Sequence, residues 1–344
     1  MEIYTPSPNV MDFSTEAGSV DWVEEEEEEE DDYSRNAMYI TFCIIVSILG
    51  TVGNGLVIWI TGFKMKKTMT TIWFLNLGIA DFSFCLFLLL YVSDAELWAA
   101  SPLDLILCKL SFFTLYLNQY ASVLFLTVIS IDRCVCVLCP IWSRNHRTSR
   151  LAAIISVIIW LLTITLSSPY FIFSNFVDDD FNFQCTGSNT PLEDTTTIDY
   201  TTLDLIDKAT ATTEFVSAFL IPFSIILVCY GLIAFTVRKN SRIPGSARTL
   251  KIITTTVICF FFCWVLYYML PMINMVGPDT EWPGRNHLFE LAQCLAFFNS
   301  CLNPIIYVFI GRDFKQVLRR SIPFLMESTF RERNDPQETQ EDNI

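Results

Sequence analysis

Asp132 and Arg133 form an acid–base pair at the end of a long apolar run, residues 105–137, which has Cys108 close to its beginning. As a helix with a rise of about 1.5 Å per residue, the segment from Cys108 to Arg133 is roughly 38 Å long. This length exceeds a membrane hydrocarbon core of about 30 Å. The run therefore predicts a helix with a thiol on one side of a membrane and the acid–base pair on the other. One end can be cross-linked in an oxidising compartment, and the other can contact a cytosolic partner.

Asp81 is an acid inside a second apolar run, where an ionised carboxylate is costly without a partner. Polar side chains also occur at middle depth in two other runs, at Asn118, Ser122 and Asn299. Oxygen ligands that include one carboxylate suit a small hard cation, so these four residues predict a Na⁺ site. The alternative is a structural acid that is hydrogen-bonded to polar neighbours.

Seven apolar runs are long enough to position these residues across a membrane. They cover residues 38–63, 71–93, 105–137, 151–173, 212–238, 249–275 and 287–310. The chain is 52% hydrophobic and only 17% charged, whereas soluble domains carry about a quarter charged residues. We therefore predict an all-α membrane protein, a bundle of seven transmembrane helices over residues 38–310. A short amphipathic eighth helix on the membrane surface is expected over 311–322, followed by a cytoplasmic tail over 323–344.

Basic residues gather in alternate connections between the runs, which the positive-inside rule assigns to the cytoplasm. The N-terminus is then extracellular, in a multi-pass protein of the plasma membrane. Residues 1–37 are predicted to be a disordered acidic tail, because the run from Glu24 to Asp32 carries only negative charge. This tail is either a docking arm for a cationic ligand or a solvated leader. Tyr33, which follows the acidic run, is a candidate for sulfation.

The predicted topology leaves two of the twelve cysteines clearly on the outer side, Cys108 and Cys185. A disulfide between them would tie the loop that contains Cys185 over the helix bundle, in a compartment that permits it. The alternative is two free thiols.

Several enzyme and transporter classes are excluded by the residues they require. A retinal protein needs a lysine in the last run, and residues 287–310 contain none. The two histidines, His146 and His287, are far apart and outside the apolar cores, which excludes a clustered metalloprotease site. An aspartyl membrane protease needs two acids at depth, and Asp81 is the only deep one. No inverted repeat of broken helices suggests a transporter. We predict that the chain is not an enzyme and has no nucleic-acid partner.

Known motifs occur in order and at suitable depths along the chain: Gly53-Asn54, Leu77-x-x-Ala80-Asp81, Cys108 with Cys185, Asp132-Arg133-Cys134, Cys263-Trp264 and Asn303-Pro304 through Tyr307. Together they resemble the rhodopsin-like (class A) G-protein-coupled receptors over residues 38–321. Within this family, the chain resembles the leukocyte chemoattractant branch, and most of all its formyl-peptide and chemerin receptors. This narrower resemblance rests on residues 131–138, 145–148, 295–304 and 307–314.

This resemblance implies a chemotactic receptor in inflammation, with an extracellular peptide or small protein as ligand. It implies signalling mainly through an inhibitory heterotrimeric G protein, with arrestin and membrane lipids as further partners. Arg133, beside Asp132, would engage the G protein. Tyr230, Asn303, Pro304 and Tyr307 belong to the part that rearranges on activation.

The resemblance also implies that Asp81, with Ser122 and Asn299, holds sodium in the inactive state, and that Trp264 is a switch beneath the ligand. The expected pocket contains an acid and several aromatic residues: Tyr91, Tyr116, Glu214, Trp264, Tyr267 and Gln293.

The sequence departs from the family pattern at the pocket and in the sixth run. Formyl-peptide receptors carry an acid and two arginines at the positions of Tyr116, Thr210 and Glu214, so a ligand with a basic or neutral tip is expected instead. Leu266 stands where the family has a proline, which removes the usual kink point. This favours an alternative function, an atypical scavenging or presenting receptor that couples weakly to G protein.

Overall fold

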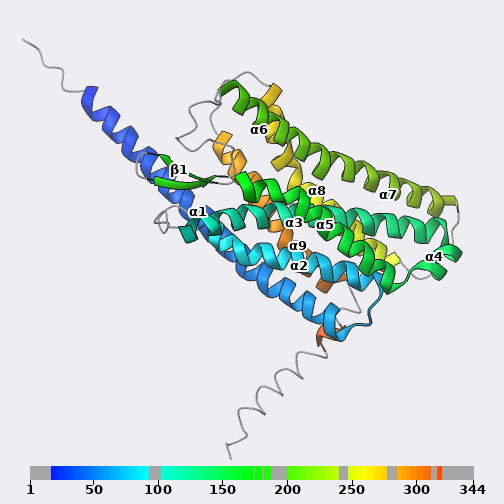
Figure 1. Cartoon of the computed structure of the whole chain (residues 1–344). Coiled ribbons are helices and arrows are strands. Elements are labelled where there is room, and N and C mark those ends of the chain that lie inside the picture. Colours follow the sequence, from blue (N-terminus) through cyan, green and yellow to red (C-terminus); the bar gives the residue numbers. More distant parts are fainter. Residues whose placement is uncertain are drawn as a thin grey trace, which may run out of the picture. The chain divides into compact units, whose positions relative to one another are not determined.

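The structure is a computed structural model that describes residues 17–92, 102–173, 175–179, 182–186, 200–239, 247–276, 285–310 and 316–319 (Figure 1). The chain divides into two compact units, Met1–Phe42 and Cys43–Ile344. The boundary between them lies inside the first helix. The larger unit contains the residues that the sequence singles out for chemistry, and the two units are described separately.

The elements are almost all helical. In chain order they are α1 (Ala17–Trp59), η1 (Ile60–Lys64), α2 (Met69–Val92), α3 (Pro102–Leu138), α4 (Pro140–His146), α5 (Ser149–Phe173), β1 (Asn175–Asp179), β2 (Asn182–Thr186), α6 (Tyr200–Glu214), η2 (Phe215–Leu220), α7 (Ile221–Lys239), α8 (Ala247–Val276) and α9 (Arg285–Ile310). Residues 316–319 are also helical.

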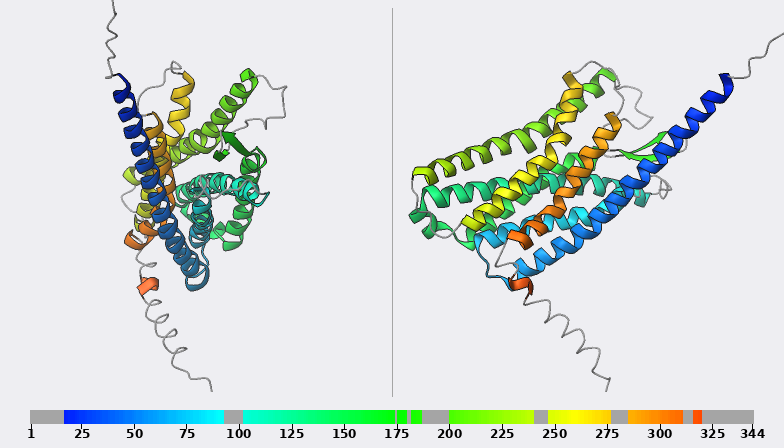
Figure 2. Two further views of the ribbon diagram at one scale, coloured as in Figure 1. Left: turned by 90° about the vertical axis from the view of Figure 1, so that its left-hand side faces the viewer. Right: turned by 180° about the vertical axis from the view of Figure 1, so that it is seen from behind.

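In the larger unit the long helices run side by side as a bundle (Figure 2). Within the described part of the chain, six helical segments are long and apolar enough to cross a membrane, and each coincides with one of the first six predicted spans. The seventh span corresponds to α9, which packs against α2 and α8. The predicted helical bundle is therefore confirmed. Below, the two ends of the bundle are called the Cys108 end and the Arg133 end, after residues on α3.

Two features of the described chain differ from the predictions. β1 and β2 form an antiparallel hairpin between α5 and α6, in register from Asn175↔Thr186 to Asp179↔Asn182, where no strand was predicted. In the smaller unit α1 begins at Ala17, so residues 17–37 are helical rather than disordered. Glutamate has a high intrinsic helix propensity, although like charges four residues apart oppose it. Residues 1–16 lie outside the described part.

The eighth helix is described only in part, because residues 311–315 and 320–322 of the predicted segment lie outside the description. Its helical residues 316–319 include Val317 and Leu318, which pack on a buried cluster of Val57, Ile60 and Ile306. This contact agrees with an amphipathic segment whose apolar side faces the bundle.

The bundle is apolar on its outside and carries polar groups inside. Leu161, Val228 and Phe262 are 60–67% exposed on outer faces, whereas Asn54 and Asp81 are completely buried. Exposed apolar surface of this extent is unfavourable in water and suits contact with lipid tails. Inner aromatic rings, among them Trp73, Phe125, Phe260 and Trp264, pack with aliphatic side chains in a buried core cluster.

Candidate functional site

A π-helical turn places Glu214 at the bundle interior. Glu214 ends α6 and precedes η2, and Pro222 follows η2 near the start of α7. Proline has no N–H and its ring disfavours a regular α-helical bond to the preceding turn, so a widened turn before Pro222 has a local cause. Single π turns are frequent at functional sites.

Glu214 is held by neutral hydrogen-bond donors from two other helices. Gln119 Nε2 donates to Glu214 Oε1 at 2.6 Å, and Tyr170 Oη donates to Glu214 Oε2 at 3.3 Å. Gln119 Nε2 also donates to Tyr268 Oη at 2.6 Å, so α3, α5, α6 and α8 meet at this carboxylate. Among the described residues, neither of the ion pairs involves Glu214.

Aromatic rings surround this carboxylate. Tyr116 stacks on Tyr170 with an interplanar angle of 12°. Trp264 contacts Tyr267 edge to face at 5.4 Å between centroids and lies 5.8 Å from Tyr268. The indole nitrogen of Trp264 is buried and has no hydrogen-bond partner within the described chain. The arrangement is a cluster of apolar rings around one acid.

The structure therefore brings together four of the six predicted pocket residues: Tyr116, Glu214, Trp264 and Tyr267. Gln293 is half-buried on α9, where it has an interaction partner of its own. Tyr91 belongs to α2, but its side chain lies outside the described part. Thr210, at which the sequence analysis expected a departure from the family pattern, is exposed on α6.

The sequence prediction did not include Gln119, Tyr170 or Tyr268 in the pocket. These residues are uncharged and lie in apolar runs, so composition does not mark them. The signal that could have found Gln119 is its spacing, because residues three apart on a helix share a face and Tyr116 lies three residues earlier.

Asp81 lies at the centre of a second polar cluster, and it is completely buried. Asn303 Nδ2 donates to Asp81 Oδ2 at 2.8 Å, which links α2 to α9. The other carboxylate oxygen, Oδ1, accepts no hydrogen bond from any described residue. A buried carboxylate with one unsatisfied oxygen is costly unless a donor or cation reaches it.

The other predicted sodium residues form a chain of hydrogen bonds through Ser300. Asn118 Nδ2 donates to Ser300 Oγ at 3.1 Å, and Ser122 Oγ donates to Asn118 Oδ1 at 3.4 Å. Asn299 is also buried, and its Nδ2 has no partner among the described residues. Ser300 was not predicted as a site residue, yet its carbonyl accepts a bond from Asn54 Nδ2 at 2.8 Å.

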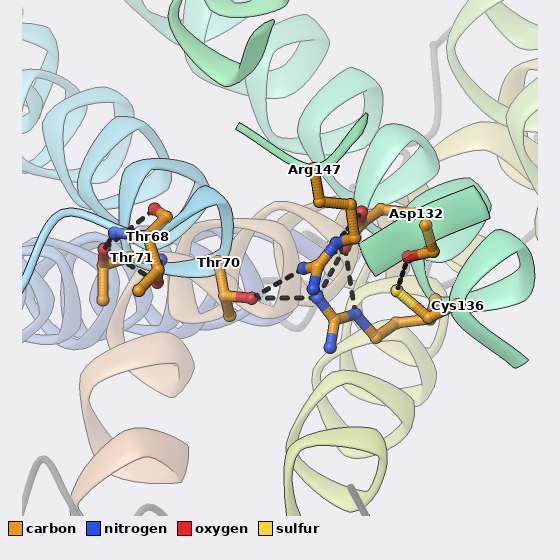
Figure 3. A network of polar contacts seen from close by, with 8 residues as sticks. Thr68, Thr70, Thr71, Asp132, Cys136 and Arg147 are labelled. Atoms are coloured by element: carbon orange, nitrogen blue, oxygen red, sulfur yellow. Dashed lines mark hydrogen bonds and ion pairs between the residues drawn. The ribbon is translucent and has the colours of Figure 1, made fainter. Parts of the chain in front are cut away.

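A third network lies at the Arg133 end and joins two arginines to one acid (Figure 3). Arg133 Nη2 lies 2.5 Å from Asp132 Oδ2, and it also donates to Thr70 Oγ1 on α2 at 2.9 Å. Arg147, between α4 and α5, contacts the same carboxylate through Nε at 2.8 Å and Nη2 at 3.0 Å. Asp132 therefore pairs with two guanidinium groups at once.

Arg147 was not among the predicted site residues. Burial lowers the pKa of the Arg147 guanidinium, but the hydrogen bonds and negative charge of Asp132 outweigh this effect and raise the pKa above its usual value. Arg147 is therefore a permanent cation in this network. Two positive charges on one acid leave a net positive charge at this end of α3.

The residues predicted to rearrange lie on α7 and α9, and one of them, Asn303, is the donor to Asp81 described above. Tyr230 packs against a buried cluster of Cys134, Cys229 and Ile233, and its hydroxyl has no hydrogen-bond partner in the described chain. Tyr307 is buried and its ring lies 4.5 Å from that of Phe74 on α2. Pro304 lies inside α9, one residue after Asn303.

At the opposite end, Cys108 is disulfide-bonded. Among the described residues, ten other cysteines are not in disulfides. Cys185 lies on β2, and both strands of the hairpin contact α3. This placement supports the predicted Cys108–Cys185 pairing, which stays a prediction because the side chain of Cys185 lies outside the described part.

Comparison with known proteins identifies the family. Residues 53–307 match the family described as "7 transmembrane receptor (rhodopsin family)". The chain belongs to this family. It is therefore a membrane receptor and not an enzyme, as the sequence analysis predicted.

The receptor is similar to two kinds of chemoattractant receptor. N-formyl peptide receptor 2 of Pongo pygmaeus is 39% identical over 304 residues, 84% of each chain, and that of Homo sapiens is 38% identical over the same coverage. Chemerin-like receptor 1 of Sus scrofa is 41% identical over 281 residues, 79% of this receptor and 76% of the relative. The predicted resemblance to the chemoattractant branch is confirmed.

Proposed function

We propose that this receptor is a cell-surface receptor for a peptide or small-protein chemoattractant with a cationic tip, and that it signals mainly through an inhibitory G protein. The relatives, named for formyl peptide and chemerin-like reception, support the chemoattractant class. The surroundings of Glu214 support the cationic tip.

The observation that carries the proposal is a carboxylate without a cation in an aromatic cluster. Glu214 has only neutral partners, Gln119 and Tyr170, among the described residues. Neutral hydrogen bonds only partly offset the cost of removing an ionised carboxylate from water. A lysine, arginine or terminal ammonium group of a ligand would complete the pair, and the rings of Tyr116 and Tyr267 would add cation–π attraction.

The proposed orientation places the Cys108 end outside the cell and the Arg133 end in the cytoplasm. Lys64, Lys66, Lys67 and Arg150 lie at the connections of the Arg133 end, in accord with the positive-inside rule. The acidic run Glu24–Asp32 then lies on the ligand side. An extracellular surface with charges of one sign raises the encounter rate with a ligand of the opposite charge.

The proposed contact with the G protein is Arg133. In the structure it is held by Asp132 and Thr70, and activation would release it toward the partner. Tyr230, Asn303, Pro304 and Tyr307 would form the part that repacks, because a proline inside α9 weakens backbone bonding at that point. Arrestin would use the same end.

The Asp81 cluster fits a sodium ion. Asp81 Oδ1 is a buried oxygen without a hydrogen bond in the described chain, and Ser122, Asn118 and Asn299 supply further oxygens. A bound Na⁺ would supply a positive charge that neutralises the carboxylate. The residues themselves would hold α2, α3 and α9 in one arrangement.

A nucleotide-exchange assay with the full-length receptor and an inhibitory G protein tests the function. We expect basic peptides to stimulate exchange, and Glu214→Gln to raise the half-maximal concentration at least tenfold, because a buried charge pair is lost. Glu290→Gln on α9 is the matched control, since it removes one carboxylate from the same end of the bundle; it should shift the concentration less than about threefold. Equal responses of the two variants would refute the proposal that a cationic tip of the ligand pairs with Glu214.

Leu266 favours the scavenging receptor as a second candidate. α8 continues through this position as a helix, and its proline lies further along, at Pro271. Helices kink most readily at proline, so the outward movement of α8 has no hinge at the usual place. The same assay separates the two functions, because peptide binding without nucleotide exchange would favour the scavenging receptor over the signalling receptor.

A further inference from the structure

A cavity of about 550 Å³ lies between α2 and α5 at the Arg133 end. Its lining includes Lys67 just before α2 and Arg150 in the first turn of α5. Ile72, Leu75 and Val157 form part of its apolar wall. It shares no residue with the Glu214 cluster or the Asp81 cluster, so neither ligand recognition nor sodium binding accounts for it.

The polar groups in the wall are already satisfied by one another. Trp160 Nε1 donates to Asn76 Oδ1 at 2.7 Å, and Asn76 Nδ2 donates to Ser156 Oγ at 3.2 Å. Ser156 Oγ in turn donates to a backbone carbonyl at 2.8 Å. Because these side chains are hydrogen-bonded within the protein, they do not require water as a partner in the inner part of the cavity.

The two cations are the exception. Lys67 and Arg150 are exposed, and neither has an ion-pair or hydrogen-bond partner among the described residues. The cavity thus combines an apolar wall with two unpaired positive charges. A ligand that complements it has an apolar chain and an anionic head.

The position of the cavity indicates that such a ligand comes from the membrane. Val157 and Ala153 are exposed on the outer face of α5, which is one of the segments able to cross a membrane. Lys67 and Arg150 lie at the ends of membrane-crossing segments, where basic side chains reach the headgroup layer. Acyl chains and lipid headgroups are therefore available at these depths without entry from water.

We propose that this cavity binds one anionic phospholipid of the leaflet at the Arg133 end. Its phosphate and carboxylate groups pair with Lys67 and Arg150, and an acyl chain lies against Ile72, Leu75 and Val157. The assignment to the cytoplasmic leaflet rests on the proposed orientation of the receptor, whereas the site itself does not. Anionic lipids are enriched in that leaflet and attract basic residues near the surface.

The site adjoins the arginine network without being part of it. Figure 3 shows Thr70 pointing toward Arg147, while Thr68 and Thr71 form a separate group at the first turn of α2. Thr71 lines the cavity, and its hydroxyl accepts a bond from the Thr68 N–H at 2.7 Å. The lipid would therefore pack on one side of the turn that presents Thr70 to the arginines on another.

Native mass spectrometry of the purified full-length receptor tests the proposal. The probes are dioleoyl phosphatidylserine and dioleoyl phosphatidylcholine, titrated separately from detergent micelles. We expect one phosphatidylserine to bind in preference, and the double variant Lys67→Gln/Arg150→Gln to weaken its binding at least about tenfold, since each basic residue near the surface contributes on the order of 1 kcal/mol.

The control is Lys66→Gln/Arg144→Gln, which removes the same charge from exposed residues of the same end that do not line the cavity. It should leave phosphatidylserine binding unchanged. Ala153→Trp provides a second variant that narrows the cavity and retains both cations, and it should lower binding as well. Thermal melting in phosphatidylcholine alone checks that each variant is folded.

The proposal would be overturned by equal binding of the two lipids, by equal loss in the control variant, or by preferential retention of a sterol that is insensitive to Lys67 and Arg150. Water-soluble glycerophosphoserine should not compete, and competition by it would assign the site to a free phosphate instead. The assay contains no peptide and no G protein, so its failure would leave the proposed receptor function untouched.

Discussion

Two carboxylates inside the bundle have different surroundings, which suit the different roles that we propose for them. Asp81 is completely buried among amides and hydroxyls, with Asn303 as its hydrogen-bond donor. Glu214 is half-buried among aromatic rings, with Gln119 and Tyr170 as donors. Small oxygen groups can close around a bare ion, whereas rings leave space for an organic cation. This difference supports the proposals that sodium binds at Asp81 and the ligand at Glu214.

Replacing Asp81 by Asn should abolish stabilisation of the receptor by sodium. A ligand that binds only the folded state raises its melting temperature, so NaCl should raise the melting temperature of the ligand-free wild type. N-methylglucamine chloride at the same ionic strength is the control, because its cation is too large for the cluster. A sodium effect that persists in Asp81→Asn would show that the ion binds elsewhere.

Replacing Thr70 by Val should raise basal nucleotide exchange several-fold. The substitution keeps the shape of the side chain but removes the oxygen that Arg133 contacts at 2.9 Å, and a hydrogen bond to a charged group contributes about 1.5–3 kcal/mol. Arg133 is then held by Asp132 alone. Thr70→Ser retains the hydroxyl and should behave as wild type. Unchanged exchange in Thr70→Val would mean that this contact does not restrain Arg133.

At the scale of the elements, α1 and α9 pack closely where a small residue faces a rigid ring. A Cβ atom at Gly53 would lie 3.0 Å from Cγ and 3.1 Å from Cβ of Pro304. The proline ring cannot swing away as a flexible side chain would. The two helices thus need glycine at this position to pack beside Pro304, which is part of the proposed activation segment.

Gly53→Ala should therefore destabilise the receptor by about 1–3 kcal/mol through overpacking, measured as a lower melting temperature in detergent. Gly231→Ala on α7 is the matched control, because no atom lies within 4 Å of its added Cβ. There the higher helix propensity of alanine should stabilise by up to about 1 kcal/mol. Equal melting temperatures for the two variants would contradict the close contact.

At the scale of the whole molecule, the larger unit has polar networks inside and apolar side chains outside. Asn54 Nδ2 and Asn118 Nδ2 donate across helices to the carbonyl and the hydroxyl of Ser300, while Ile158 and Leu227 are exposed. In lipid, polar groups must find partners within the protein, so helices that share such groups assemble. The basic connections at one end then set the direction in the membrane.

Cys139 provides a test of that direction. It is an exposed free thiol directly after α3, at the Arg133 end. A membrane-impermeant maleimide should leave it unlabelled on intact cells and label it after permeabilisation. Comparison with Cys139→Ser assigns the signal to this residue. Labelling of Cys139 on intact cells would place the Arg133 end outside and reverse the proposed topology.

Much of this architecture could be predicted from the sequence, because a bilayer demands long apolar helices and leaves few alternatives. The lengths of the runs predicted the spans, and isolated charged residues within them or at their ends marked Asp81 and Arg133. The resemblance to formyl-peptide receptors marked Glu214. The hairpin of β1 and β2 was missed, because its strands lie in a polar connection and show no clear alternation of apolar and polar residues.

What only the tertiary structure decided is which side chains from different helices meet. Gln119, Tyr170 and Arg147 became part of the sites because α3, α5 and the connection after α4 bring them to Glu214 and Asp132. Nothing in their types marks them, because an amide, a phenol and a loop arginine are common residues. The sequence by itself determined how deep each residue lies along its own helix. Packing determined its partners, because neighbours across a bundle depend on how each helix is rotated about its axis.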